Sequence, residues 1–214
     1  MKSLIDPLLV VVALLNLAML VTGRLRACIR LAAWQGVALG VLALPLSHDG
    51  VGFRLVAVAI ITIALKGWLF PTLLLRATRT ADVKHETEPY VGLAASAMAG
   101  VGMLMLSVWL GSRFELPVPT TSPLVLPMAF FSVLVGLFLI ISRRTAVMQV
   151  VGYLVLENGI FIFGVAMAHE EPFLVEMGVL LDVFVAVFVM GIAIFHISRE
   201  FDHIDVDQLS TLRD

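Results

Sequence analysis

The sequence has few charged residues and a single cysteine, and these shortages exclude several classes of protein. Only 14% of its 214 residues are charged and 60% are hydrophobic, whereas soluble domains carry roughly 25% charged residues. The mean hydropathy is +1.04. A chain of this composition has too little polar surface to cover a water-soluble globule. With one cysteine, Cys28, an internal disulfide and a cluster held by several thiolates are both excluded.

The chain also lacks an excess of either charge. Its 14 basic and 16 acidic residues give a net charge of −2, and no basic stretch is interleaved with aromatic residues, so we expect no nucleic-acid partner. No glycine-rich nucleotide loop, nucleophile triad or pair of haem ligands is present. We therefore expect no catalytic centre, no metal and no cofactor in this chain.

Long apolar runs recur along the chain instead. Spanning a bilayer takes about 20 apolar residues at about 1.5 Å of rise each. Seven segments reach this length, at residues 4–22, 27–46, 54–75, 89–111, 123–142, 146–167 and 172–197. They predict an all-α integral membrane protein with about seven transmembrane helices. We interpret the first run as a retained helix, with a signal peptide as the alternative.

Basic residues are distributed unevenly between alternate loops, which predicts the orientation. One side collects ten of them: Arg24, Arg26, Arg30, Arg76, Arg79, Lys84, Arg143, Arg144, Arg199 and Arg213. The other side has three: Lys2, Arg54 and Arg113. Because cytoplasmic loops collect positive charge, we expect the N-terminus outside and the C-terminus in the cytoplasm.

Ionisable residues occur inside the apolar segments. Lys66, Glu157 and Asp182 lie near segment midpoints, and Glu176 lies nearer the outer face. A charge at the centre of a membrane helix costs roughly 2.5–3.5 kcal/mol, so these groups must face the bundle interior, pair or bind protons. Buried carboxyl groups can exchange protons near neutral pH. A Lys–Asp or Lys–Glu pair that only holds helices together is the alternative, and whether Lys66 contacts Glu157 or Asp182 stays open.

Three further features bear on the interior of the bundle. Gln149 and Asn158, in the same segment as Glu157, indicate a polar path through the membrane. Pro71 predicts a kink one turn after Lys66. A ridge of small residues on the fourth segment favours close helix packing; it consists of Gly92, Ser96 and Gly100.

Long strings of the sequence resemble a known family. They are GYLVLENGIFIFG, GVLLDVFVAVFVMGIAIFHISREFD and IDVDQLSTLRD, with DPLLVVVALLNLAML and RLRACIRLAAWQG near the start. These strings resemble component E of hydrogenase-4 complexes. Residues 123–197 are also similar to the small K subunit of respiratory complex I and to the C component of Mrp-type antiporters. By this resemblance, residues 1–122 form a four-helix region, 123–197 a three-helix unit and 198–214 a cytoplasmic tail.

The resemblance implies a non-catalytic membrane subunit of a redox-driven, proton-translocating hydrogenase or formate hydrogenlyase-like complex in the cell inner membrane. Its partners would be antiporter-like and H-like membrane subunits and a hydrophilic arm that holds the metal centres. In K subunits two adjacent helices each carry a glutamate of the proton path. Glu157 and Asp182 are the candidates here, with aspartate in place of one glutamate, whereas Lys66 lies outside the K-like unit.

Two other functions stay open from the sequence. One is membership of an Mrp-type cation/proton antiporter without a redox partner. The other is a structural scaffold subunit, although mid-membrane acids are not expected in a scaffold. The tail at 198–214 has apolar residues near helical spacing, and we expect it to dock on a neighbouring subunit.

Overall fold

The computed structural model describes residues 4–46, 53–80, 90–114 and 122–167. In these ranges the regular structure is helical: α1 (Ile5–Val21), α2 (Leu25–Leu46), α3 (Phe53–Thr62), the π-helix η2 (Ile63–Leu69), α4 (Phe70–Thr80), α5 (Leu93–Arg113), α6 (Val125–Ser142) and α7 (Ala146–Met167). Each of the first six predicted segments corresponds to one helical rod, because α3, η2 and α4 are continuous. The seventh segment and the tail at 198–214 lie outside the described residues.

The described helices confirm an all-α membrane protein. Five are long and apolar enough to cross a bilayer: Leu25–Pro45, Ala59–Arg76, Leu93–Arg113, Val125–Ser142 and Ala146–Gly164. The helix α1 is a shorter apolar helix of 17 residues. The third rod ends at Thr80 instead of residue 75, and α5 begins at Leu93 instead of residue 89.

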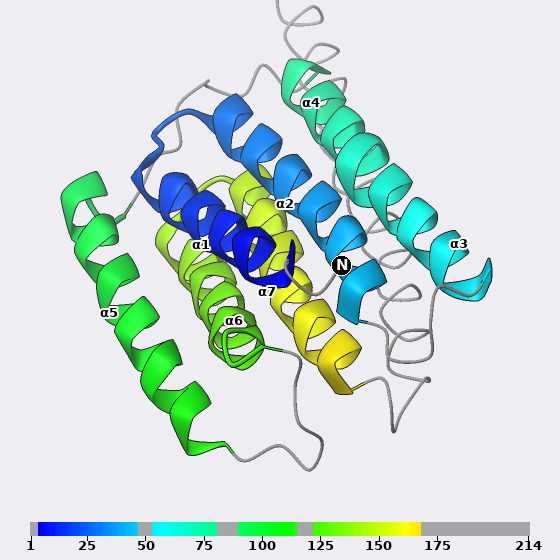
Figure 1. The fold of residues 1–214 in the computed structure, drawn as a ribbon. Helices are drawn as coiled ribbons and strands as arrows, with labels where there is room; N and C mark the ends of the chain where they lie inside the picture. The colour runs from blue at the N-terminus through cyan, green and yellow to red at the C-terminus, as the bar shows by residue number, and fades with distance from the viewer. Residues whose placement is uncertain (1–3, 47–52, 81–89, 115–121, 168–214) are drawn as a thin grey trace, which may run out of the picture.

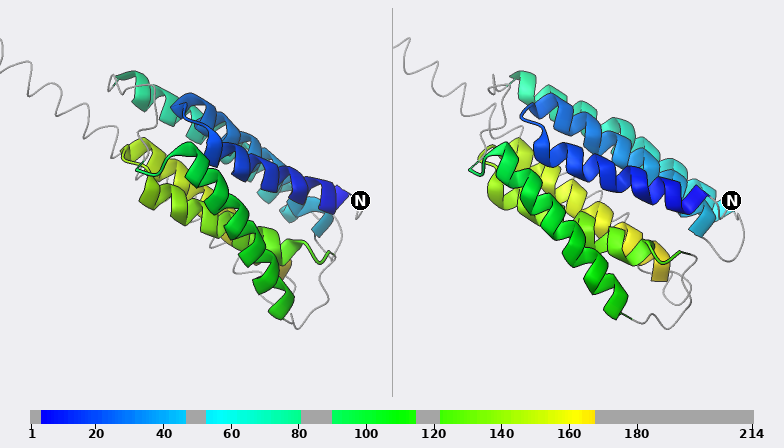
Figure 2. Two further views of the ribbon diagram at one scale, coloured as in Figure 1. Left: turned by 90° about the vertical axis from the view of Figure 1, so that its left-hand side faces the viewer. Right: turned by 60° about the vertical axis from the view of Figure 1, so that its left-hand side comes forward.

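The helices form two layers (Figures 1 and 2). One layer contains α1, α2 and the rod α3–η2–α4, and the other contains α5, α6 and α7. The helix α2 is central, because it contacts α1, α3, η2 and α4 in its own layer and α7 in the other. The helix α6 contacts α1, α5 and α7. Side chains on α1, α2, η2, α6 and α7 can therefore meet between the layers.

Glycines allow the helices to approach closely at three contacts. A Cβ atom on Gly136 of α6 would lie 2.4 Å from the Leu156 backbone nitrogen of α7. A Cβ atom on Gly36 of α2 would lie 2.4 Å from the Lys66 Cβ. On the predicted ridge of α5, Ser96 and Gly100 are buried, and Gly100 faces Leu20 of α1. Gly92 is the N-cap of α5 and has no neighbour that a Cβ would meet.

Two apolar clusters fill the described bundle, one toward each end. The first includes Leu20, Ile29, Leu74, Val135 and Met148. The second includes Leu9, Leu39, Val125, Met128 and Ile162. Between the clusters lies a layer of buried polar side chains: Asn16 on α1, Gln35 on α2, Ser132 on α6, and Glu157 and Asn158 on α7. The polar layer thus crosses the bundle at mid-depth, with apolar side chains on both sides of it.

Candidate functional site: a buried ion pair and a chain of amides

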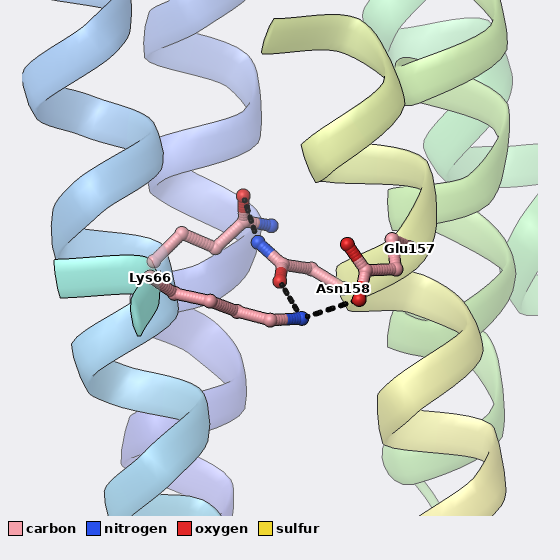
Figure 3. A network of polar contacts seen from close by, with 4 residues as sticks. Lys66, Glu157 and Asn158 are labelled. Atoms are coloured by element: carbon pink, nitrogen blue, oxygen red, sulfur yellow. Dashed lines mark hydrogen bonds and ion pairs between the residues drawn. The ribbon is translucent and has the colours of Figure 1, made fainter. Parts of the chain in front are cut away.

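A buried ion pair occupies the middle of the polar layer. The Lys66 Nζ lies 3.1 Å from the Glu157 Oε1 and donates a second hydrogen bond, of 3.0 Å, to the Asn158 Oδ1 (Figure 3). The three residues are at most 5% exposed. Lys66 is 13 residues from Phe53 and 14 from Thr80, and Glu157 is 11 from Ala146 and 10 from Met167. Both charges therefore lie halfway along their helical rods, as the sequence predicts.

A π-helical segment positions Lys66. The Phe70 N–H bonds to the Leu65 carbonyl, five residues back, and Pro71 has no N–H to donate to the carbonyl of Gly67 four residues before it. A π-turn holds more residues per turn than an α-helix, so it changes the direction in which the following side chains point. The sequence predicts a kink at Pro71; the structure has this π-helical segment directly before Pro71, and Lys66 lies within it. Such segments are frequent at functional sites.

The ion pair continues into a chain of hydrogen-bonded side chains. The Asn158 Nδ2 donates to the Gln35 Oε1 at 3.3 Å, and the Gln35 Nε2 donates to the Asn16 Oδ1 at 3.1 Å. The Asn16 Nδ2 then donates to the Ser132 Oγ at 2.9 Å. Counted from Lys66, this chain of hydrogen bonds joins the two layers three times: between η2 and α7, between α7 and α2, and between α1 and α6. Its direction is across the bundle, whereas the sequence suggested a path along it.

Some of these residues are predicted from the sequence and others are not. Lys66, Glu157 and Asn158 stand out in the sequence, and the structure brings them together. Gln149 is exposed and lies outside the chain of hydrogen bonds. Asp182 and Glu176 lie outside the described residues. Of the two partners considered for Lys66, Glu157 is in contact with it, and Asp182 lies outside the described residues.

Gln35, Asn16 and Ser132 were not identified from the sequence as site residues. A compositional signal was available, since Asn16 and Asn158 are the only two asparagines in the sequence. An amide in the middle of an apolar helix is costly unless it is hydrogen-bonded, so each of the two asparagines required a partner. Which partner each would find depends on helix packing, which the sequence does not display.

A small cavity lies beside the ion pair. It is lined by Lys66 and Asn158 and by apolar residues that lead toward the first cluster: Ile29, Ala32, Ala33, Phe70, Pro71, Leu74 and Leu154. The cavity is on the side of Lys66 that faces the α1–α2 and α6–α7 turns.

At one end of the bundle, the guanidinium groups of Arg143 and Arg144 connect the α6–α7 turn to α1 and to the start of α5. Arg143 is fully buried, and its Nη2 donates to the Leu20 carbonyl at the C-terminus of α1 at 3.0 Å. Burial lowers the pKa of the Arg143 guanidinium below its usual range. Arg144 stacks on the Tyr90 ring, with 4.4 Å between the guanidinium carbon and the ring centroid. The Tyr90 N–H bonds to the Ser142 carbonyl at 2.9 Å, so the start of α5 is fixed to the α6–α7 turn.

Together the fold and the site define a multi-pass membrane protein with ionisable and amide side chains at mid-depth. The family described as NADH-ubiquinone/plastoquinone oxidoreductase chain 4L matches residues 123–214. The uncharacterized protein Rv0085 of Mycobacterium tuberculosis is 35% identical over 191 residues, which are 89% of this chain and 87% of that relative. Hydrogenase-4 component E of Escherichia coli strain K12 and that of Shigella flexneri are each 29% identical over 145 residues, 68% of this chain and 67% of theirs. No solved structure matches the chain.

Most of the chain is therefore similar to hydrogenase-4 component E, and the complex I chain 4L family matches its C-terminal part. This similarity supports a membrane subunit of a complex I-like complex.

Proposed function

We propose that this chain is a non-catalytic membrane subunit of a redox-driven, proton-translocating complex of the hydrogenase or formate hydrogenlyase type. The observation that carries the proposal is the Lys66–Glu157 pair, buried halfway along its helices with 3.1 Å between its charged atoms. Ionisable groups at mid-membrane are expensive and typically belong to ion or proton pathways.

The role of the pair follows from its electrostatics. Glu157 would bind and release a proton as the field in the site changes, and Lys66 would be its counter-ion. Since one pKa unit corresponds to about 1.4 kcal/mol, a field change of a few kcal/mol would move a proton on or off the site. Asp182 and Glu176 are the proposed partners in this path beyond the described residues.

The surroundings of the chain follow from the same proposal. We place it in the cell inner membrane with seven spans, the N-terminus outside and the C-terminus in the cytoplasm, with residues 123–197 as its K-like unit and 198–214 as a docking tail. Antiporter-like and H-like membrane subunits would be its neighbours. A hydrophilic arm would hold the metal centres, and this chain would hold no cofactor.

The test is the variant Glu157→Gln in the assembled complex. Glutamine preserves the shape of the side chain and can still accept a hydrogen bond from Lys66, but it cannot exchange a proton. We expect the complex to assemble and electron-driven proton translocation into vesicles to fall to the level of an uncoupled control. Gln149→Ala, on the exposed face of the same helix α7, is the matched control and should pump normally. Normal pumping by Glu157→Gln would contradict the proposal.

The antiporter alternative predicts a different driving force. An Mrp-type subunit would support cation/proton exchange in vesicles without an electron donor. Dependence of proton movement on hydrogen or formate oxidation therefore distinguishes the two functions.

A further inference from the structure

The chain of side chains from Lys66 to Ser132 has a single direction. Four successive hydrogen bonds run from Lys66 to Asn158, Gln35, Asn16 and Ser132, with lengths of 3.0, 3.3, 3.1 and 2.9 Å. In each bond the member nearer to Lys66 is the donor. Each of the three amides thus turns its oxygen toward the ammonium group and its nitrogen away from it.

The chemistry of the first member determines this direction. A lysine ammonium group has three donors and no acceptor, so Asn158 must present its oxygen to Lys66. Its nitrogen then faces Gln35, which must present its own oxygen, and the same constraint passes on to Asn16. The hydroxyl of Ser132 can either donate or accept, so the far end imposes no direction. Among the described residues, the charge on Lys66 is therefore the constraint that orders the four bonds.

Composition and burial both indicate that this series of hydrogen bonds is a specific feature of the fold. Both asparagines of the 214-residue sequence belong to it. Asn16, Gln35 and Ser132 are completely buried and Asn158 is 2% exposed. Buried amides in an apolar interior are stable only when hydrogen-bonded, and aligned hydrogen bonds polarise one another. The four side chains come from α1, α2, α6 and α7, so no single pair of helices accounts for the arrangement.

We propose that the chain from Lys66 to Ser132 is a directional relay that carries the charge state of the ion pair to the contact between α1 and α6. While Lys66 is charged, the amides are held in one orientation. When that charge is removed, each amide can rotate and exchange its oxygen with its nitrogen, and Ser132 then changes from acceptor to donor. The relay concerns the orientation of hydrogen bonds and holds whether or not Glu157 conducts protons.

The asparagine count makes the relay directly observable. The full-length chain, labelled with ¹⁵N-asparagine and held in lipid bilayers, has two side-chain amide signals in solid-state NMR, from Asn16 and Asn158. We expect Lys66→Met to shift both signals, although Asn16 is three hydrogen bonds away from Lys66. Lys66→Arg keeps a positive, donor-only group and should leave the Asn16 signal near its original position.

Interrupting the series of hydrogen bonds with a second substitution distinguishes a relay from a general disturbance of packing. In a Gln35→Leu background, Lys66→Met should still shift Asn158 but no longer Asn16. Two results would overturn the relay. One is a shift of the Asn16 signal when Lys66→Met is added to Gln35→Leu, and the other is an unchanged Asn16 signal in Lys66→Met alone. If Lys66→Met does not fold, the neutral pair Lys66→Met with Glu157→Gln replaces it in the same comparison. The readout is spectroscopic, so its failure is independent of the pumping test on Glu157.

Discussion

At the scale of single residues, the ion pair contributes more to the choice of one helix arrangement than to the net free energy of unfolding. Transferring Lys66 and Glu157 from water to an interior where they are at most 5% exposed costs several kcal/mol per ion, and their attraction roughly offsets this cost. Removing Lys66 alone is different, because the Glu157 carboxylate then remains in a medium that solvates it poorly, whereas Glu157→Gln leaves Lys66 with acceptors on the glutamine and on Asn158. The two residues should therefore behave as a unit under mutation.

This coupling gives a prediction for stability. Lys66→Met should lower the free energy of unfolding by about 3–5 kcal/mol, measured by titrating the full-length chain in mixed micelles with a denaturing detergent. Adding Glu157→Gln to that variant should recover part of the loss, because it removes the buried negative charge. A Lys66→Met variant as stable as the original chain would show that the contact contributes nothing to the fold.

The amides allow a second comparison at the same scale. Gln35→Leu leaves Asn158 without its acceptor and Asn16 without its donor, and each buried polar group that loses its partner costs about 1–3 kcal/mol. Gln149→Leu is the matched control, since Gln149 is exposed and an exposed substitution typically changes stability by about 0.5 kcal/mol or less. Equal midpoints for the two variants in the same detergent titration would contradict the hydrogen-bond chain.

The residue-scale features divide into those visible in the sequence and those that require packing. The depth of Lys66 and Glu157 follows from counting residues along an apolar run, since rise per residue fixes depth in a helix. Their contact joins residues 91 positions apart, and the bond from Asn158 to Gln35 joins residues 123 apart. Periodicity within one helix carries no information about which face of another helix it meets. Gln35 was therefore missed, while Gln149 was expected near the path and is exposed.

At the scale of elements, close contacts at glycines set the geometry of the site. The backbones of α2 and η2 meet at Gly36, next to Gln35, where an added Cβ would lie 2.4 Å from the Lys66 Cβ. Together with the π-helical segment, this contact determines where the ammonium group lies. The sequence predicts a kink at Pro71 and a small-residue ridge on α5, but it does not show the π-helical segment or that Gly36 meets Lys66.

A pair of glycine substitutions tests this packing. Gly36→Ala should force α2 and η2 apart and lower stability by about 1–3 kcal/mol, as overpacked substitutions typically do. Gly102→Ala is on α5, with no atom within 4 Å of the added Cβ. It should be neutral or slightly stabilising, because alanine is more stable than glycine inside a helix. Titration of both variants with the denaturing detergent measures the difference. Equal stability of the two would show that α2 and η2 are not in close contact at Gly36.

At the scale of the whole molecule, the two ends of the bundle differ in charge. Arg143 and Arg144 lie beside the C-terminus of α1 and the start of α5 at one end. At the other end, the Ser122 hydroxyl donates to the Asp6 carboxylate, which joins the starts of α6 and α1. The sequence predicts this alternation from loop charges, and the described contacts join the α6–α7 turn to the C-terminus of α1 and to the start of α5.

This asymmetry predicts which end faces the cytoplasm. Positive charge is retained on the cytoplasmic side during insertion, so the end with Arg143 and Arg144 should face inward. Two exposed residues at opposite ends of α5, Tyr90 and Phe114, suit single-cysteine variants in a Cys28→Ser background. A membrane-impermeant maleimide added to intact cells should label Phe114→Cys and not Tyr90→Cys, while permeabilised cells should show labelling of both. Because Tyr90 and Phe114 flank one spanning helix, the reverse pattern would invert the proposed orientation, and labelling of both in intact cells would mean that α5 does not cross the bilayer.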